Sequence, residues 1–269
     1  MLPEKPKLIV TVVIEGMRYD YLQQFEPQFS RGGFKKLMAQ GTQCTNMYHN
    51  AAFLHNATGI ANISTGSTAS EHGMVSNWWY SRFYKQKINC VNDYSQTAVG
   101  CPNKKSVQVS PQYLAASTFG EELYKYTKGK SKVFSIALQP YAAVLAAGKK
   151  ATGVFFLDEF TGNWITSSYY SQALPSWLGI FNAKKHAYQH INREWTPLMS
   201  LDYYKESWSD DNEFEIGFNS QRTFPYNITY LSDTYKPFRI LKQIPYGNSY
   251  TKDFAVELID KEQLGKRSE

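Results

Sequence analysis

The residues of this chain that could do chemistry stand where predicted strands end and predicted helices begin. Glu15 follows an apolar run, Asn56 opens a segment rich in small residues, and Gln139–Tyr141 follows another apolar run. In sheets covered by helices on both faces, ligands bind outside the carboxyl ends of the strands. A carboxylate at this edge could ligate a metal ion, and a helix that begins there offers its free N–H groups to an anion.

The histidines do not indicate a metal site. His186 and His190 have an i,i+4 spacing, which on a helix places two imidazoles on one face. No acidic third ligand stands at a known distance from them, so we expect a solvent-facing polar role. His72 precedes Gly73, and we expect it to serve a turn rather than to ligate a metal.

The three cysteines, Cys44, Cys90 and Cys101, are an odd number and have no CxxC spacing. This excludes a zinc knuckle and a thioredoxin-type redox motif. Cys90 and Cys101 stand 11 residues apart and could close a small loop as a disulfide, provided that the compartment is oxidising. Both states of this pair remain open from the sequence.

An α/β fold is predicted from the elements that must position these residues. Lys7–Ile14 is a continuous β-branched run, typical of a strand buried on both faces of a parallel sheet. Asn56–Thr65 consists of small residues that let a helix pack closely on a sheet, with Asn56 as its N-cap. The other expected elements are helices over Met17–Phe25, Gly33–Gln40, Ala115–Thr127 and Asp253–Leu264, a strand over Lys132–Leu138, and a hairpin of Gly153–Asp158 with Asn163–Tyr170.

The chain divides into three predicted parts. Residues 1–174 carry the α/β pattern and form the expected core. Residues 175–245 are aromatic, proline-punctuated and irregular, which is typical of a cap or insertion. Residues 246–269 contain the last helical pattern and are expected to return to the core.

Composition excludes two classes of function. The formal net charge is +6, but the basic residues are scattered as pairs and form no stripe, so we expect no nucleic-acid binding. No run approaches the ~18–20 apolar residues that a membrane-spanning helix needs, so we expect no membrane span. The cluster Trp78–Tyr80 could stack on a substrate ring or pack within the core.

Seven segments, in order along almost the whole chain, resemble the N-terminal half of type I phosphodiesterase/nucleotide pyrophosphatase proteins. Within them the sequence is most similar to the single-chain, threonine-dependent alkaline phosphatases of Bacteroidetes. The segments are Ile9–Leu22, Gly32–Leu37, Ile63–Ser67, His72-Gly73 with Asn77-Trp78, Ala137–Gly148, Leu157–Tyr170 and Pro245–Asn248. The resemblance implies an alkaline-phosphatase-like α/β fold with a doubly wound, mostly parallel sheet, truncated before the second half of the family's chain.

The resemblance also implies a two-zinc phosphoryl-transfer site, in which an Asp ligates zinc, a Thr attacks, and an Asn, a Lys and an Arg hold the phosphoryl oxygens. Glu15 stands at the Asp position and is the one metal-ligand candidate. Asn56 stands at the nucleophile position, and Gln139 and Tyr141 stand at the Lys and Arg positions. Only Asn77 matches a phosphate-contacting residue directly. The family's remaining Asp and His ligands belong to its C-terminal half.

Three hypotheses follow. In the first, the chain is a pseudoenzyme with a degenerate site that still binds a small anion, a phosphate ester or a protein partner; no cofactor is expected in this chain. In the second, it is a zinc-dependent phosphomonoesterase or phosphodiesterase completed by a missing C-terminal half. In the third, residues 175–245 form a protein-binding surface. The resemblance implies a periplasmic or secreted location, with the leader absent from this chain.

Overall fold

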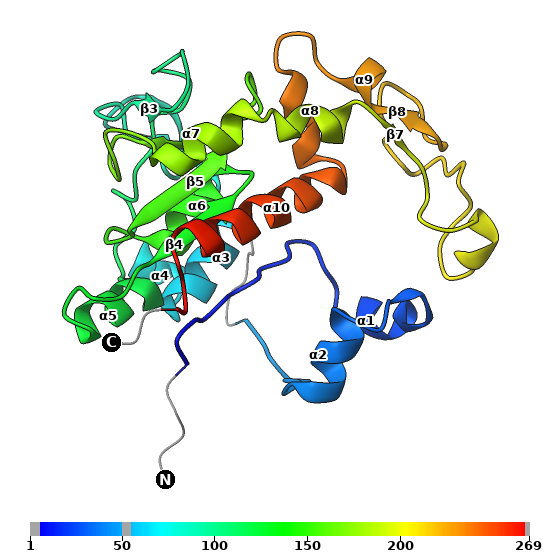
Figure 1. The fold of residues 1–269 in the computed structure, drawn as a ribbon, viewed down its shortest axis with the longest axis horizontal. Coiled ribbons are helices and arrows are strands. Elements are labelled where there is room, and N and C mark those ends of the chain that lie inside the picture. Colours follow the sequence, from blue (N-terminus) through cyan, green and yellow to red (C-terminus); the bar gives the residue numbers. More distant parts are fainter. Residues whose placement is uncertain (1–5, 50–54, 267–269) are drawn as a thin grey trace. The chain divides into compact units, whose positions relative to one another are not determined.

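The computed structural model describes residues 6–49 and 55–266 (Figure 1). The chain forms two compact units, which are described separately. Of the described residues, the first unit contains 6–8, 55–195 and 227–266, and the second contains 9–49 and 196–226. The predicted cap, residues 175–245, is therefore divided between the two units.

The first unit carries most of the helices and strands. Its helices are α3 (Asn56–Thr65), α4 (Ala69–His72), α5 (Phe119–Tyr126), α6 (Pro140–Ala147), α7 (Ser176–Ala183), α8 (His186–Ile191), η3 (Pro237–Lys242), α9 (Ile228–Leu231) and α10 (Tyr246–Lys261). Its strands are β1 (Trp78–Ser81), β2 (Gln86–Asn89), β3 (Ala98–Val99), β4 (Phe134–Ala137), β5 (Gly153–Leu157), β6 (Trp164–Ser167) and β7 (Glu194–Trp195). The helix predicted over Asn56–Thr65 is confirmed, and it ends at Gly66 as expected.

The four-stranded sheet has the order β3-β6-β5-β4. Strands β4 and β5 are parallel, whereas β5 with β6 and β6 with β3 are antiparallel. The predicted α/β class and the hairpin after β5 are confirmed. Within that class the described sheet is mixed, because only Glu159–Gly162 and its neighbours separate β5 from β6 and so short a connection cannot cross back to a parallel position.

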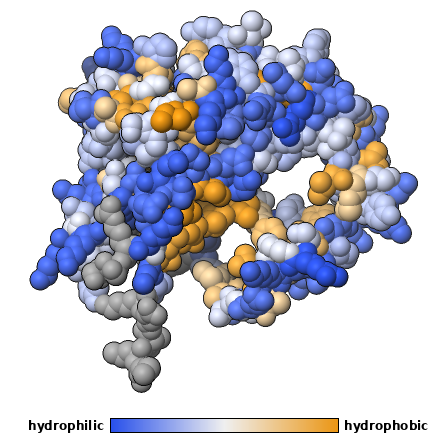
Figure 2. All heavy atoms as spheres, viewed as in Figure 1, coloured by the Kyte–Doolittle hydropathy of each residue, from blue (hydrophilic) through white to orange (hydrophobic). Residues whose placement is uncertain are grey.

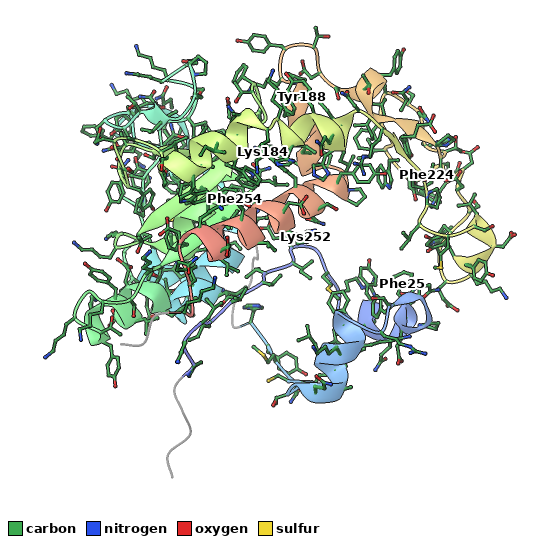
Figure 3. The ribbon with its side chains drawn as sticks, viewed as in Figure 1. Phe25, Lys184, Tyr188, Phe224, Lys252 and Phe254 are labelled. Atoms are coloured by element: carbon green, nitrogen blue, oxygen red, sulfur yellow. The ribbon has the colours of Figure 1, made fainter. Side chains whose placement is uncertain are left out.

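Both faces of the sheet are covered by helices, which makes every residue of β5 buried. Val154 and Phe156 face the cluster that contains the buried residues of α3 and α6. Phe155 points to the opposite face, where its ring lies 6.3 Å from Trp177 on α7 and 5.6 Å from Phe254 on α10. Figure 3 shows Phe254 on the side of α10 that faces the sheet. Because successive side chains of β5 point to opposite faces of the sheet, the strand packs against a helical layer on each face.

The C-terminal end of α6 is held by the start of α5. Thr118 and Glu121 form a capping box, in which the Thr118 N–H donates to Glu121 Oε2 at 2.8 Å. Glu121 Oε1 also accepts from the Lys149 N–H at 3.0 Å, and the Thr118 hydroxyl donates to the Ala147 carbonyl at 3.1 Å. These bonds fix α6 at the end opposite to Tyr141.

Residues 7–14 do not form the predicted strand. Their large apolar side chains are exposed, for example Ile9 at 62% and Val12 at 76%. Figure 2 shows hydrophobic residues at the surface where Figure 1 draws this segment. A strand requires a hydrogen-bonded neighbour, and within the described residues no strand pairs with this run. Its β-branched composition is therefore not sufficient to make it a strand here.

The second unit contains short elements: α1 (Tyr21–Gln24), η1 (Glu26–Gln28), α2 (Phe34–Gln40), η2 (Leu201–Tyr203) and the start of β8 (Tyr226–Asn227). Its two segments are joined by hydrogen bonds from the Gln24 side chain to the Glu206 carbonyl and from the Gln28 side chain to the Tyr203 carbonyl. None of its four helices has a buried residue. In the described parts of both units, no helix combines the length and apolar character needed to cross a bilayer.

Candidate functional site

Asn56 is the first residue of α3, and its amide is directed at α6. Its Nδ2 donates to the Tyr141 hydroxyl at 3.2 Å. The prediction that Asn56 caps the helix is wrong, because His55 is the N-cap residue and its side chain makes no capping bond. A capping side chain must come from the residue before the helical backbone begins, and Asn56 already lies inside the helix.

Asn77 supplies the missing cap from a distant part of the chain. Its Oδ1 accepts from the Ala57 N–H at 2.8 Å. The Asn77 carbonyl accepts from the Asn89 side chain at 3.1 Å and from the Cys90 N–H at 3.0 Å, so the hairpin of β1 and β2 holds it in place. One of the free N–H groups at the start of α3 is therefore already satisfied.

Gln139 and Tyr141 flank the start of α6. Gln139 is the N-cap residue of α6, although its side chain makes no capping bond. Its Oε1 accepts instead from Lys242 Nζ at 3.1 Å. The structure thus brings Asn56, Asn77 and Tyr141 together at the start of α3, and Gln139 joins them through the first turn of α6.

A half-buried charge cluster beside Gln139 was not predicted from the sequence. Glu159 lies 2.8 Å from Lys242 and 3.1 Å from Lys236, measured between carboxylate oxygen and ammonium nitrogen. Burial alone raises the pKa of Glu159, but bonds and charge from Lys242 and Lys236 outweigh it and hold that pKa below its ordinary value. Burial lowers the pKa of Lys242, against the opposing effect of Glu159.

The signal for this cluster was present in the sequence. Asp158 and Glu159 directly follow the buried run that became β5, so the rule that ligands bind at the carboxyl ends of strands would have selected them. Lys236 and Lys242 carried no such signal, because they come from the N-cap and the last residue of η3, about 80 residues further along the chain.

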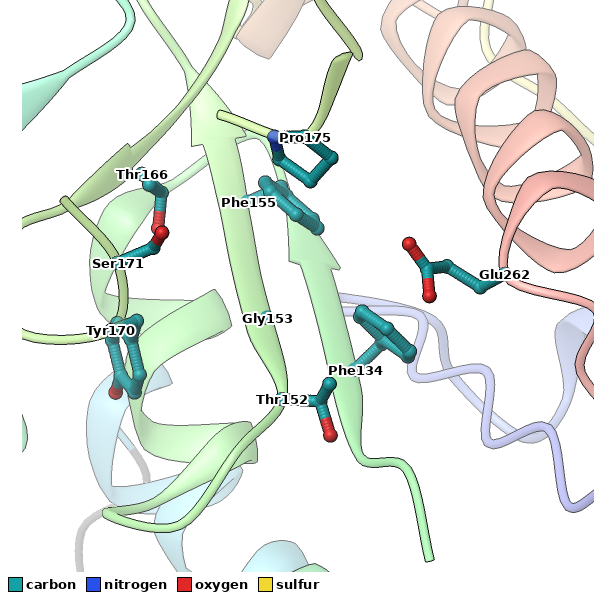
Figure 4. Close-up of a pocket in the computed structure, with 9 residues that line it drawn as sticks. All are labelled: Phe134, Thr152, Gly153, Phe155, Thr166, Tyr170, Ser171, Pro175 and Glu262. Atoms are coloured by element: carbon teal, nitrogen blue, oxygen red, sulfur yellow. The ribbon is translucent and has the colours of Figure 1, made fainter. Parts of the chain in front are cut away.

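A cavity of about 490 Å³ opens beside this cluster. Gln139, Tyr141 and Glu159 line it, whereas Asn56 and Asn77 do not. A second cavity of about 80 Å³ lies on the sheet between Phe134, Phe155 and Glu262 (Figure 4). Ligand pockets usually measure roughly 300–1,000 Å³, so only the larger cavity has the size for a small molecule.

Glu15 lies in the second unit, in an exposed turn after residues 8–14. The three residues around the start of α3 belong to the first unit. The assignment of Glu15 as a metal ligand is therefore not tested by this geometry and stays a prediction.

His72 is completely buried and serves the turn, as predicted. Its Nδ1 accepts from the Met74 N–H at 3.0 Å, and its Nε2 lies 2.6 Å from Asn62 Oδ1. This pattern requires the proton on Nε2, and burial lowers the pKa of His72. Gly73, the next residue, has φ +78°, which glycine adopts without strain. Both ring nitrogens are thus committed, and none remains for a metal ion.

The expectation of a solvent-facing histidine pair is wrong for His190. Helix α8 packs against α10 and η3, which buries His190 at 8% exposure. Its Nε2 lies 3.5 Å from Asp253, and burial followed by the charge of Arg193 lowers its pKa. The acidic neighbour was missed because Asp253 stands on α10, 63 positions away in sequence.

The tryptophans and cysteines take different environments. Trp79 packs edge-on against Tyr113 at 5.4 Å, whereas Trp78 is 51% exposed and lines the larger cavity. Lys87 Nζ lies 5.6 Å from the centroid of the Trp78 ring. One ring therefore packs against the core, and the other borders the cavity beside a lysine. Cys90 is buried and Cys101 is half-buried; both are free thiols in the structure, so the loop-closing disulfide is not formed.

The side chains at the start of α3 do not fit zinc. Zinc in proteins is bound by Cys, His, Asp and Glu, and this group offers two amides and a phenol. The Asn77 oxygen is also occupied by the Ala57 N–H. Over residues 6–49 and 55–266, no three His, Cys, Asp or Glu side chains are grouped so that they could hold a metal ion.

Residues 9–236 match the family described as type I phosphodiesterase / nucleotide pyrophosphatase. The chain belongs to this family. Three relatives are similar to it over almost its whole length. Identity is 36% with a protein named calcium-transporting ATPase from Myroides odoratus, 34% with the alkaline phosphatase PafA of Elizabethkingia meningoseptica, and 32% with the alkaline phosphatase PhoV of Synechococcus elongatus. Each alignment covers 97% of this chain and 48% of the relative.

The fold of this family member agrees with solved structures of PafA. Wild-type PafA superposes with a TM-score of 0.91 at 33% identity, over 99% of this chain and 52% of the PafA chain. A PafA variant with Thr→Ser, Asn→Ala, Lys→Ala and Arg→Ala substitutions gives a TM-score of 0.92 at 32% identity, over 98% and 51% of the two chains. The chain thus has the alkaline phosphatase fold and spans about half the length of the relatives it matches.

Proposed function

We propose that this chain is a non-catalytic member of the type I phosphodiesterase/nucleotide pyrophosphatase family, which binds anionic ligands without hydrolysing them. The observation that carries the proposal is the residue at the start of α3. Asn56 stands there with its amide bonded to Tyr141, where a phosphoryl-transfer site of this family would need a nucleophile.

The spacing of four positions supports this assignment. The substituted Thr, Asn, Lys and Arg of the PafA variant are separated by 21, 62 and 2 positions. Asn56, Asn77, Gln139 and Tyr141 of this chain have the same separations. Matched in this order, the Asn is retained, while the Thr, the Lys and the Arg are each replaced.

Each replacement removes a different part of the chemistry. Attack on phosphorus needs an oxygen or sulfur nucleophile that can lose its proton, and the carboxamide of Asn56 offers none. Gln139 and Tyr141 are neutral, so neither supplies the positive charge that stabilises the developing negative charge. Losing a single stabilising donor costs roughly 10²–10³ in kcat in enzymes that act by such electrostatic stabilisation.

What remains is the capacity to hold an anion. The Asn77 oxygen is bound to the Ala57 N–H, but the side-chain Nδ2 of Asn77 is a donor. Lys242 brings a positive charge to Gln139, although its pairing with Glu159 offsets part of it. This arrangement can orient an anion and cannot attack it.

The test combines metal analysis with hydrolysis of p-nitrophenyl phosphate and bis-p-nitrophenyl phosphate. We expect less than stoichiometric zinc after incubation with the metal, and no turnover above buffer. The matched control is Asn248→Ala, which changes an exposed amide on α10. Stoichiometric zinc together with turnover that Asn56→Ala abolishes and Asn248→Ala preserves would overturn the proposal.

A second candidate rests on the length of the relatives, since this chain covers 48% of PafA. In that case the chain is part of a zinc-dependent phosphoric ester hydrolase, whose remaining ligands, with Glu15, are supplied by a C-terminal half. It predicts that a chain extended to the relatives' length binds zinc and hydrolyses phosphate esters. An extended chain that binds no zinc contradicts this candidate. For both candidates we propose a periplasmic or secreted location.

A further inference from the structure

The larger cavity has the composition of a site for an organic anion, and Gln139 and Tyr141 line it whereas Asn56 and Asn77 do not. Its volume of about 490 Å³ lies within the range of small-molecule sites. Its walls come from the β1–β2 region, the loop after β2, the turn after β5, the start of α6 and η3. All of these belong to the first unit.

The charge of the wall favours an anion. Four basic side chains and two acidic ones line the cavity. Lys236 and Lys242 share one carboxylate, that of Glu159. In the described part of the chain, the two other basic side chains, Lys105 and Arg239, have no ion-pair partner. The wall therefore carries a formal surplus of two positive charges, which a negative ligand would neutralise.

Arg239 and Lys236 are placed to act on the same group. They stand three residues apart at the start of η3, where the Arg239 N–H donates to the Lys236 carbonyl at 3.0 Å. Both side chains line the cavity. A guanidinium and an ammonium in the wall of one cavity can bind the oxygens of a single carboxylate or phosphate.

Neutral donors complete the wall. Among the described residues, the Gln139 side chain uses its Oε1 for Lys242, and the Asn92 side chain uses its Oδ1 for the Asn89 N–H. Among the same described residues, the Gln139 Nε2 and the Asn92 Nδ2 have no hydrogen-bond acceptor, and both residues line the cavity. A ligand that satisfies the cavity must therefore bring several oxygen acceptors in addition to its charge.

Two aromatic rings give the ligand a flat surface. Trp78 is 51% exposed and Tyr94 is 48% exposed, and both line the cavity. Exposed aromatic rings beside amide donors suit a sugar ring, whose apolar C–H face packs on the aromatic ring while its hydroxyl groups bond to the amides.

We propose that this cavity binds an acidic monosaccharide, with its carboxylate or phosphate on Arg239 and Lys236 and its ring on Trp78 or Tyr94. The hydroxyl groups accept from Gln139 and Asn92. The inference deepens the proposed function and rests on it, because Gln139, Tyr141 and Lys242 line the cavity although Asn56 and Asn77 do not; the bound sugar need not be a phosphate ester.

Isothermal titration with four probes tests the proposal: glucuronate, glucose 6-phosphate, glucose and inorganic phosphate. We expect both acidic sugars to bind. Glucose, which lacks the charge, and inorganic phosphate, which lacks the ring, should each bind at least about tenfold more weakly. No binding of either acidic sugar at millimolar concentration would overturn the proposal, as would glucose or inorganic phosphate binding equally well and being weakened to the same extent by Arg239→Ala.

Variants assign the binding to the cavity. Arg239→Ala and Trp78→Ala should each weaken binding of glucuronate about tenfold, and Arg239→Lys should recover part of the loss. Both side chains are exposed, so the folded state is expected to persist, which circular dichroism checks. Lys150→Ala removes an exposed lysine outside the cavity and should change nothing. Unchanged binding by Arg239→Ala would overturn the proposal.

The same titration keeps the two proposals distinct. Release of phosphate from glucose 6-phosphate would contradict the proposed non-catalytic function but not the cavity assignment, since glucuronate has no phosphate to release. Failure of both acidic sugars to bind would overturn the cavity assignment and leave the proposed function standing.

Discussion

Asn77 is predicted to have two separable roles, one in stability and one in anion binding. Its Oδ1 accepts from the Ala57 N–H at 2.8 Å, and Ala57 is completely buried. Asn77→Ala leaves this N–H without an acceptor. Asn77→Asp keeps an acceptor oxygen at the same place but removes the amide donor and adds a negative charge.

The magnitudes follow from this geometry. Loss of a capping acceptor costs about 0.5–2 kcal/mol, and a buried unsatisfied N–H costs about 1–3 kcal/mol, so we expect Asn77→Ala to lose about 1–2 kcal/mol. For a domain of this size the Tm should fall by about 2–8 °C. Asn77→Asp should be neutral or gain up to about 1 kcal/mol, because a carboxylate is favourable at a helix N-terminus.

Thermal unfolding and hydrogen exchange at the Ala57 amide measure the effect on stability, and titration with inorganic phosphate measures anion binding. Both variants should bind phosphate more weakly, and only Asn77→Ala should exchange the Ala57 amide faster. Asn248→Ala is the control and should leave both readouts unchanged. The reasoning is refuted if Asn77→Asp is as unstable as Asn77→Ala, or if neither variant changes the Tm.

Three further predictions follow from buried groups. Burial lowers the pKa of His72 from 6.5. Below about pH 6.5 the unfolded state therefore binds a proton that the folded state does not, and the Tm of the protein should fall between pH 7 and pH 5. The Tm of His72→Gln should fall less steeply over the same range. Gly162→Ala should lower the free energy of unfolding, measured with urea, by about 2–4 kcal/mol. The φ angle of Gly162 is +73°, and the new Cβ would lie 2.6 Å from the buried Phe238 ring. An unchanged urea midpoint would contradict this prediction. Burial raises the pKa of Cys90 to about 12. Thiol reagents should therefore label the exposed Cys44 in the native protein and should label Cys90 only after unfolding. Equal labelling rates of Cys44 and Cys90 in the native protein would disprove this prediction.

The elements that are specified locally were predictable. The small residues of Asn56–Thr65 and the stop at Gly66 define α3, and the buried run Gly153–Leu157 with its short turn defines the β5–β6 hairpin. In both cases the apolar pattern, the turn residues and the observed packing agree, which is why sequence reasoning succeeded.

Features that depend on distant partners were not predictable. Residues 7–14 have the composition of a buried strand, but composition does not supply a neighbouring strand. The capping of α3 comes from Asn77 rather than Asn56, and the acidic partner of the buried His190 comes from α10. The candidate residues at the start of α3 came from motif resemblance, whereas the salt bridges of Glu159 required the fold.

The fastening of α6 at one end has a consequence for how this protein could diverge. Thr118 and Glu121 secure the helix near Ala147, which stands six positions after Tyr141 and eight after Gln139. Side chains at the other end of the helix can then be exchanged while the scaffold keeps its shape. Tolerance to mutation should accordingly differ between the two ends of α6. Substitutions should be tolerated at its start, where ligands would bind, and should be disfavoured at its end, where α5 is bonded to it.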